Sequence, residues 1–260
     1  MRIALCQCTS TPDPKANLEA VASYAERVAD AGATLAVFPE AMMCRFGVPL
    51  RPVAEPLDGP WATAVNDIAT RHGLTILAGM FTPADEGRVR NTLLLTGTDR
   101  HLGYDKIHLF DAFGFAESDT VAPGSELVVV EFGDITLGLA ICYDVRFPEL
   151  FRALADRGAN VMALPASWGS GPGKREQWEL LVRARALDST SWVLACGQAD
   201  PGDAVTSKAP TGIGYSLVAD PFGRVSGSLA AAPDLLVVDI DPATVDTARA
   251  AIPVLANRRL

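Results

Sequence analysis

The sequence predicts an α/β fold, on two observations. Short apolar runs that indicate buried strands alternate with stretches that carry apolar residues at helical spacing, which is typical of layered α/β proteins. Polar residues, Glu40, Lys106 and Cys142, follow three of the predicted strands, at the strand ends where ligands collect in such folds. The chain has 260 residues and no low-complexity linker, so we expect one domain over residues 1–260.

The first part of the chain predicts a βαβ unit followed by an antiparallel meander. A helix is expected between Pro14 and Gly32, where the glycine acts as a C-cap. Asp58 is predicted to cap the next helix, and Gly73 stands just past its end. The expected strands cover residues 2–8, 34–38, 74–82, 88–96 and 101–105, and the second helix covers 59–72.

The second part predicts further strands and helices around one long loop. Residues 107–126 have no clear period and are expected to form a loop of the functional kind. The apolar strand expected at 135–142 stops abruptly at Cys142, and Pro148 fits the first turn of the helix that follows. The other expected elements are strands at 127–132, 160–164, 191–197 and 235–240, helices at 148–157 and about 175–189, a hairpin at 220–223, and a short C-terminal helix.

Composition excludes several classes of function. The net charge is -9 and the basic residues form no stripe, which argues against nucleic acid as a partner. No apolar run approaches the roughly twenty residues that span a bilayer, so we expect no membrane partner. The five cysteines lack paired Cys-x-x-Cys spacing and the three histidines are far apart. We therefore predict reduced thiols in the cytoplasm and no metal site.

The three polar strand ends together predict nucleophilic chemistry. A thiol with a pKa of about 8.5 is mostly protonated at neutral pH, so a catalytic cysteine needs a base or a nearby cation. Glu40 is the candidate base and Lys106 the candidate cation for Cys142. Each residue alone is more simply explained as a buried apolar thiol or a solvated charge. The hypothesis rests on all three standing at matching positions.

The chain resembles the nitrilase superfamily of carbon-nitrogen hydrolases. The resemblance rests on three separated motifs, Phe38-Pro39-Glu40, Tyr104-Asp105-Lys106 and Ile141-Cys142-Tyr143-Asp144, and it covers nearly the whole chain. Residues 6–13, 142–150 and 178–186 look like the Nit or omega-amidase-like branch. The resemblance implies a four-layer αββα sandwich, with two stacked mixed sheets flanked by helices. It also implies a homodimer, or a higher even-numbered homo-oligomer, formed through the helical layers.

The same resemblance implies an amidase that hydrolyses a small carboxylate-bearing amide, such as an omega-amide or deaminated glutathione, through a cysteine thioester and without a cofactor. Glu40 takes the thiol proton as Cys142 attacks, while Lys106 and the backbone N–H of Tyr143 stabilise the oxyanion. A second family glutamate falls on Glu117, which would position Lys106 and the substrate. The candidate substrate-binding residues are Phe46, Phe115, Arg146 and Trp168, and the possible partners of a substrate carboxylate are Arg45, Lys174, Arg175, Arg183 and Lys208.

Some residues depart from the Nit pattern and leave alternatives open. Gln177 replaces a histidine before Trp-Glu, Tyr215 replaces the histidine of Gly-His-Ser, and Asp105 replaces a basic residue, all of which affect the substrate assignment. The alternatives are a nitrilase or a carbamoyl-type hydrolase with the same triad, a Cys-His hydrolase with His108 as base, and a non-enzymatic interaction protein. The glycine-rich segment 169–174 does not fit the spacing of a phosphate-binding loop.

Overall fold

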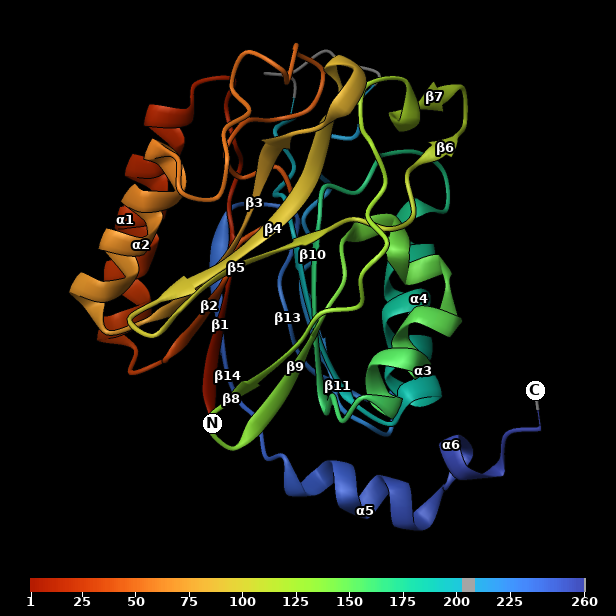
Figure 1. Cartoon of the computed structure of the whole chain (residues 1–260). Coiled ribbons are helices and arrows are strands. Elements are labelled where there is room, and N and C mark those ends of the chain that lie inside the picture. Colours follow the sequence, from red (N-terminus) through yellow and green to blue (C-terminus); the bar gives the residue numbers. More distant parts are fainter. Residues whose placement is uncertain (203–208, 260) are drawn as a thin grey trace.

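Two six-stranded sheets stack on each other, and each is covered on its outer face by a pair of helices (Figure 1). The computed structural model describes residues 1–202 and 209–259. From one side to the other the layers are α1 with α2, the first sheet, the second sheet, and α3 with α4. The predicted four-layer αββα sandwich is therefore confirmed.

The first sheet is mixed and has the order β14-β1-β2-β3-β4-β5. Its central strands β1, β2 and β3 are parallel, while β14 and the β3-β4-β5 meander pair antiparallel. Its strands and helices are β1 (Arg2–Gln7), β2 (Leu35–Val37), β3 (Thr75–Pro83), β4 (Val89–Gly97), β5 (Arg100–Asp105), β14 (Asp234–Asp239), α1 (Pro14–Asp30) and α2 (Pro60–His72). The predicted βαβ unit and meander are confirmed.

The second sheet repeats this plan, with the order β13-β12-β11-β10-β9-β8 and a parallel centre of β9, β10 and β11. Its elements are β8 (Val129–Phe132), β9 (Ile135–Leu139), β10 (Val161–Ala166), β11 (Trp192–Gly197), β12 (Leu217–Ala219), β13 (Val225–Ser228), α3 (Pro148–Asp156) and α4 (Lys174–Ser189). The chain ends in α5 (Ala243–Ala251) and α6 (Val254–Asn257). The parallel strands of both sheets thus send their carboxyl ends toward one end of the sandwich (Figure 1).

Three local predictions were wrong or incomplete. Asp58 does not cap α2, because the N-cap is Gly59. The longer side chain of Glu55 instead accepts hydrogen bonds from the Trp61 and Ala62 N–H groups. The predicted strand 135–142 stops at Leu139, because the chain turns there into a 3-10 helix, η3 (Cys142–Arg146). The long loop contains a small hairpin, β6 (Asp111–Ala112) with β7 (Phe115–Ala116), then η2 (Glu117–Asp119), and η1 (Asp85–Gly87) joins β3 to β4.

Candidate active site

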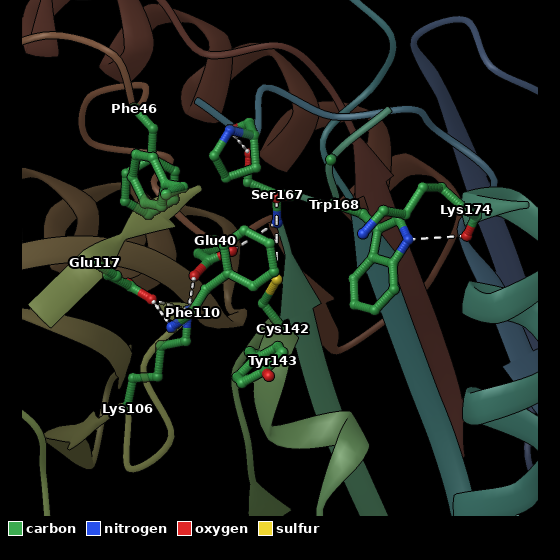
Figure 2. A pocket seen from close by; sticks show the side chains of 13 residues that line it. Glu40, Phe46, Lys106, Phe110, Glu117, Cys142, Tyr143, Ser167, Trp168 and Lys174 are labelled. Atoms are coloured by element: carbon green, nitrogen blue, oxygen red, sulfur yellow. Dashed lines mark hydrogen bonds and ion pairs between the residues drawn. The ribbon is translucent and has the colours of Figure 1, made fainter. Parts of the chain in front are cut away.

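Four of the predicted site residues converge on one cavity of ≈ 400 Å³ (Figure 2). Glu40 follows β2, Lys106 follows β5, Glu117 begins η2, and Cys142 begins η3 after β9. All four side chains are buried, with relative exposures of 1%, 2%, 2% and 7%. The sandwich therefore brings together residues that are up to about a hundred positions apart in the chain, because parallel strands end at the same edge.

Cys142 lies on a sharp turn between a strand and a helix. Its φ of 46° lies in the left-handed region, which costs a non-glycine residue about 1 kcal/mol or more and is common at functional sites. Its Sγ lies 3.9 Å from the Ser167 carbonyl oxygen. Tyr143 lines the cavity and is in the first turn of η3, where a backbone N–H has no partner within the helix.

A buried carboxylate beneath the turn fixes its geometry. Asp144 accepts hydrogen bonds from the Ile141 N–H (2.9 Å), the Tyr104 hydroxyl (2.7 Å) and the His108 N–H (3.0 Å). The His108 ring also places Nδ1 2.7 Å from Asp144, and it stacks on Phe147 with centroids 3.7 Å apart. His108 therefore contacts the support of the turn and does not line the cavity, so the structure gives the Cys-His alternative no support.

Glu40 is held through both its main chain and its side chain. Its main chain lies so close to β3 that a Cβ on Gly79 would come within 2.3 Å of the Ala41 nitrogen, which explains the glycine there. Gln198 Nε2 donates to the Glu40 carbonyl oxygen at 2.9 Å. The side-chain Oε2 accepts the Ser167 N–H at 2.7 Å. The carboxylate is thus fixed beside the residue whose carbonyl oxygen contacts the Cys142 thiol.

Lys106 bridges the two buried carboxylates. Its Nζ lies 3.0 Å from Glu40 Oε1 and 2.8 Å from Glu117 Oε2. Glu117 Oε2 also accepts the Phe110 N–H at 2.7 Å. Buried charges persist only when they are paired and hydrogen-bonded, and this cluster satisfies that condition. It carries two negative charges and one positive charge.

The surroundings of Cys142, Glu40 and Lys106 change the pKa of each of these three groups. Burial, and then the charge of Glu40, raises the pKa of the Cys142 thiol well above its usual range, so the resting group is a thiol. Burial also raises the pKa of Glu40, which makes it a stronger base. Burial alone would lower the pKa of Lys106, but the carboxylates of Glu117 and Glu40 raise it well above its usual range. Lys106 is therefore an ammonium beside a neutral thiol and a carboxyl group of raised pKa.

Sequence reasoning missed Asn91, which links the two carboxylates. Its Nδ2 donates to Glu40 Oε1 at 2.8 Å and to Glu117 Oε1 at 3.0 Å. Its Oδ1 is buried without a hydrogen-bond partner among the described residues. The orientation is nonetheless determined, because a flipped amide would press its oxygen against two carboxylates. The available signal was a buried asparagine in β4, beside the apolar run Leu93–Leu95.

Replacing Asn91 by Asp is expected to lower kcat/KM by about tenfold to a hundredfold and to move the acid limb of its pH profile to higher pH. A third carboxylate would face Glu40 where a donor now stands, so Glu40 would be protonated more readily. The pH dependence of ammonia release from an amide substrate measures both effects. A fall in activity with an unmoved acid limb would instead indicate a purely structural role for Asn91.

Three of the four candidate substrate-binding residues line the cavity, namely Phe46, Phe115 and Trp168. Arg146 does not line it: its Nη2 donates to Gln177 Oε1 at 2.8 Å, and its guanidinium lies over the Trp168 ring. Gln177, which replaces the histidine of the Nit pattern, is therefore a partner of this arginine. The remaining lining residues are Phe110, Tyr143, Ser167, Gly169, Lys174 and Pro210.

The described part of the chain contains neither a metal site nor a membrane-spanning helix. No group of three or more His, Cys, Asp and Glu side chains is placed to hold a metal ion in residues 1–202 and 209–259. Within the same residues, no helix is both long enough and apolar enough to cross a membrane.

Sequence comparison matches residues 2–250 to the carbon-nitrogen hydrolases. A hydrolase of Mycobacterium tuberculosis is 60% identical over 99% of this chain and 95% of its own length. A deaminated glutathione amidase of Escherichia coli O157:H7 is 33% identical over 100% and 97%. A chloroplastic omega-amidase of Arabidopsis thaliana is 31% identical over 99% and 72%.

Two solved structures share the fold over the whole chain. Nit3 of Saccharomyces cerevisiae, a member of branch 10 of the nitrilase superfamily, has a TM-score of 0.87 at 25% identity and covers 100% of this chain and 97% of its own. A variant of the amidase from Nesterenkonia sp. AN1, in complex with butyramide, has a TM-score of 0.82 at 28% identity over 100% and 94%.

Proposed function

The chain belongs to the carbon-nitrogen hydrolase family and is an enzyme of the amidase type, and we propose that it cleaves the C–N bond of a small carboxylate-bearing amide at Cys142. The observation that carries the proposal is the convergence of Glu40, Lys106, Glu117 and Cys142 on one cavity. The substrate class is supported by relatives named for omega-amides and deaminated glutathione, both of which carry a carboxylate away from the amide.

The geometry supports acyl transfer through a thioester. Because the Cys142 thiol is protonated at rest, Glu40 takes its proton as the sulfur attacks the amide carbon. The Lys106 ammonium and the Tyr143 N–H then stabilise the tetrahedral oxyanion, as preorganised donors in a dry site do. The proton on Glu40 passes to the leaving nitrogen, the C–N bond breaks, and ammonia departs with a thioester left on Cys142.

Hydrolysis of the thioester uses the same base a second time. Glu40 is again a carboxylate once ammonia has left, so it can take a proton from a water that attacks the acyl carbon. The carbon-sulfur bond breaks, the thiol recovers that proton, and the carboxylic acid is released. Glu117 acts through its contacts with Lys106 and Asn91, which hold the ammonium where the oxyanion forms. No step requires a cofactor.

We also propose a reducing cytoplasmic location and a homodimer. All five cysteines are free thiols, as expected where glutathione keeps thiols reduced. On the outer helical layer, Leu180 and Leu187 of α4 are exposed by 67% and 45%, which suits an interface formed through that layer. In sedimentation experiments we expect the wild type to be a dimer and Leu180→Lys to be a monomer. If both proteins were monomers, or both were dimers, this interface would be contradicted.

The purified protein is expected to release ammonia from omega-monoamides of dicarboxylic acids or from deaminated glutathione. Iodoacetamide is expected to label Cys142 before the other four thiols, since Cys142 lines the cavity beside Glu40 and the other four, which are also buried, do not line it. Cys142→Ala should abolish ammonia release, and Cys6→Ala serves as the control that retains it. Faster hydrolysis of matched nitriles would favour a nitrilase, and equal slow labelling without ammonia would favour a non-enzymatic protein.

A further inference from the structure

The mouth of the cavity holds an ammonium group that forms no ion pair with any described residue. Lys174, the first residue of α4, lines the cavity, and its side chain extends past Trp168 toward the space above Cys142 (Figure 2). Its Nζ lies 3.6 Å from the ring centroid of Phe113, 5.7 Å from that of Phe110 and 5.9 Å from that of Trp168. Among the described residues, no carboxylate forms an ion pair with it.

The aromatic cradle leaves the donors of this ammonium free. Three rings stabilise the cation through their faces, but they accept no strong hydrogen bond. Lys174 has three N–H donors, so a carboxylate that reaches the mouth meets a charged donor already held in place. Lys174 also lines an outer hollow that shares Phe110, Phe115 and Gly169 with the cavity. A solute can therefore approach it from outside.

Three of the other cationic candidates contact groups outside the cavity. Arg175 lies 4.0 Å over the Tyr215 ring, and Arg183 donates to the Gly223 carbonyl oxygen. Arg45 donates to the Phe46 carbonyl oxygen. Lys208 lies outside the described residues. Within those residues, Lys174 is the one member of the set that lines the cavity.

The two ends of the cavity differ in charge. Its deep end holds Glu40 and Glu117 against the single ammonium of Lys106. Its mouth holds Lys174 with Arg146 behind Trp168, and burial together with the Arg146 charge lowers the pKa of Lys174. A carboxylate is therefore repelled from the deep end and attracted to the mouth. An amide that carries a carboxylate at its far end is oriented with its amide carbon at the thiol.

We propose that Lys174, held by Phe110, Phe113 and Trp168, binds the distal carboxylate of the substrate and thereby selects amides of dicarboxylic acids over neutral amides. The inference rests on the proposed amidase function and names the residue that sets its substrate class. It also accounts for product release: hydrolysis creates a second carboxylate beside Glu40 and Glu117, where like charges repel it.

Lys174→Met tests this with two substrates of equal chain length, glutaramate and pentanamide, which differ in a terminal carboxylate against a methyl group. The variant is expected to lower kcat/KM for glutaramate about tenfold to a hundredfold, chiefly through KM, and to leave that for pentanamide within about twofold. Lys174→Arg should recover most of the loss for glutaramate. Arg175→Met removes the neighbouring cation, which faces Tyr215, and should change neither substrate.

An equal loss for both substrates, or no loss for glutaramate, would overturn the proposal. Its failure can be told apart from failure of the amidase function, because binding is measured without turnover. Calorimetry of glutarate with Cys142→Ala, with and without Lys174→Met, reports carboxylate recognition directly. Ammonia release from pentanamide with no preference for glutaramate would leave the amidase function standing and refute the role of Lys174, as would glutarate binding that is indifferent to Lys174→Met.

Discussion

Glu40→Gln is expected to lower kcat by about 10²- to 10⁴-fold, the usual contribution of a positioned base. The Cys142 thiol is protonated at rest because burial raises its pKa, so attack depends on a proton acceptor beside it. Glutamine keeps one oxygen for the Lys106 and Asn91 donors now at Oε1. Its amide nitrogen then faces the Ser167 N–H and accepts nothing.

The pH profile gives this prediction a second readout. Since burial raises the pKa of Glu40, activity of the wild type should fall, as pH decreases, at a pH above the ordinary carboxylate range. Glu40→Gln should lose that limb and also slow the labelling of Cys142 by iodoacetamide. His108→Gln tests the alternative base and should retain more activity than Glu40→Gln, because His108 contacts Asp144 beneath the turn and does not line the cavity. Loss of activity in the histidine variant alone would reverse the assignment of the base.

The positions of Glu40, Lys106 and Cys142 could be predicted from the sequence for a physical reason. Glu40 and Cys142 each follow, within a few residues, a strand whose apolar pattern is strong, whereas Lys106 follows the last strand of a meander that its turns predict. The edge at which these strands end is set by topology. Cys142 shows the limit of this reasoning. The apolar run continues to Ile141, although the strand stops at Leu139, because the turn into η3 is fixed by the Asp144 contacts with Tyr104 and His108.

The groups that form hydrogen bonds to the Glu40 and Glu117 carboxylates could not be predicted from the sequence in the same way. Asn91 meets Glu40 and Glu117 only because β4 pairs with β3 in one register, with Asn91 opposite Phe81. The donor from Ser167 is a backbone N–H, which leaves no mark on the residue type. The Asp58 cap failed for a related reason, since Glu55 is equally able to cap α2 and only the path of the preceding turn decides between them.

Lys106→Met is expected to abolish most activity and to destabilise the fold. Removing a preorganised oxyanion donor costs about 10²- to 10³-fold in kcat. The same change leaves Glu40 and Glu117 buried without their cation, and breaking a buried ion pair from one side costs about 3–5 kcal/mol in the free energy of unfolding. Lys15→Met, at an exposed lysine on α1, is the control that should change neither quantity.

The way in which the stability of Lys106→Met changes with pH distinguishes the electrostatic cost of losing the ammonium from the cost of losing the packing of the lysine stem. Burial already raises the pKa of Glu40, and removing the Lys106 charge raises it further above its unfolded value, so the folded form binds a proton more tightly and gains stability as pH falls. The Lys106 ammonium of the wild type does not titrate in that range, because its pKa is raised. The deficit of Lys106→Met in urea unfolding should therefore be largest near about pH 8 and shrink toward about pH 5. A deficit that is constant with pH would mean that the lysine stem stabilises the fold by packing alone, and that Glu40 and Glu117 do not depend on its charge.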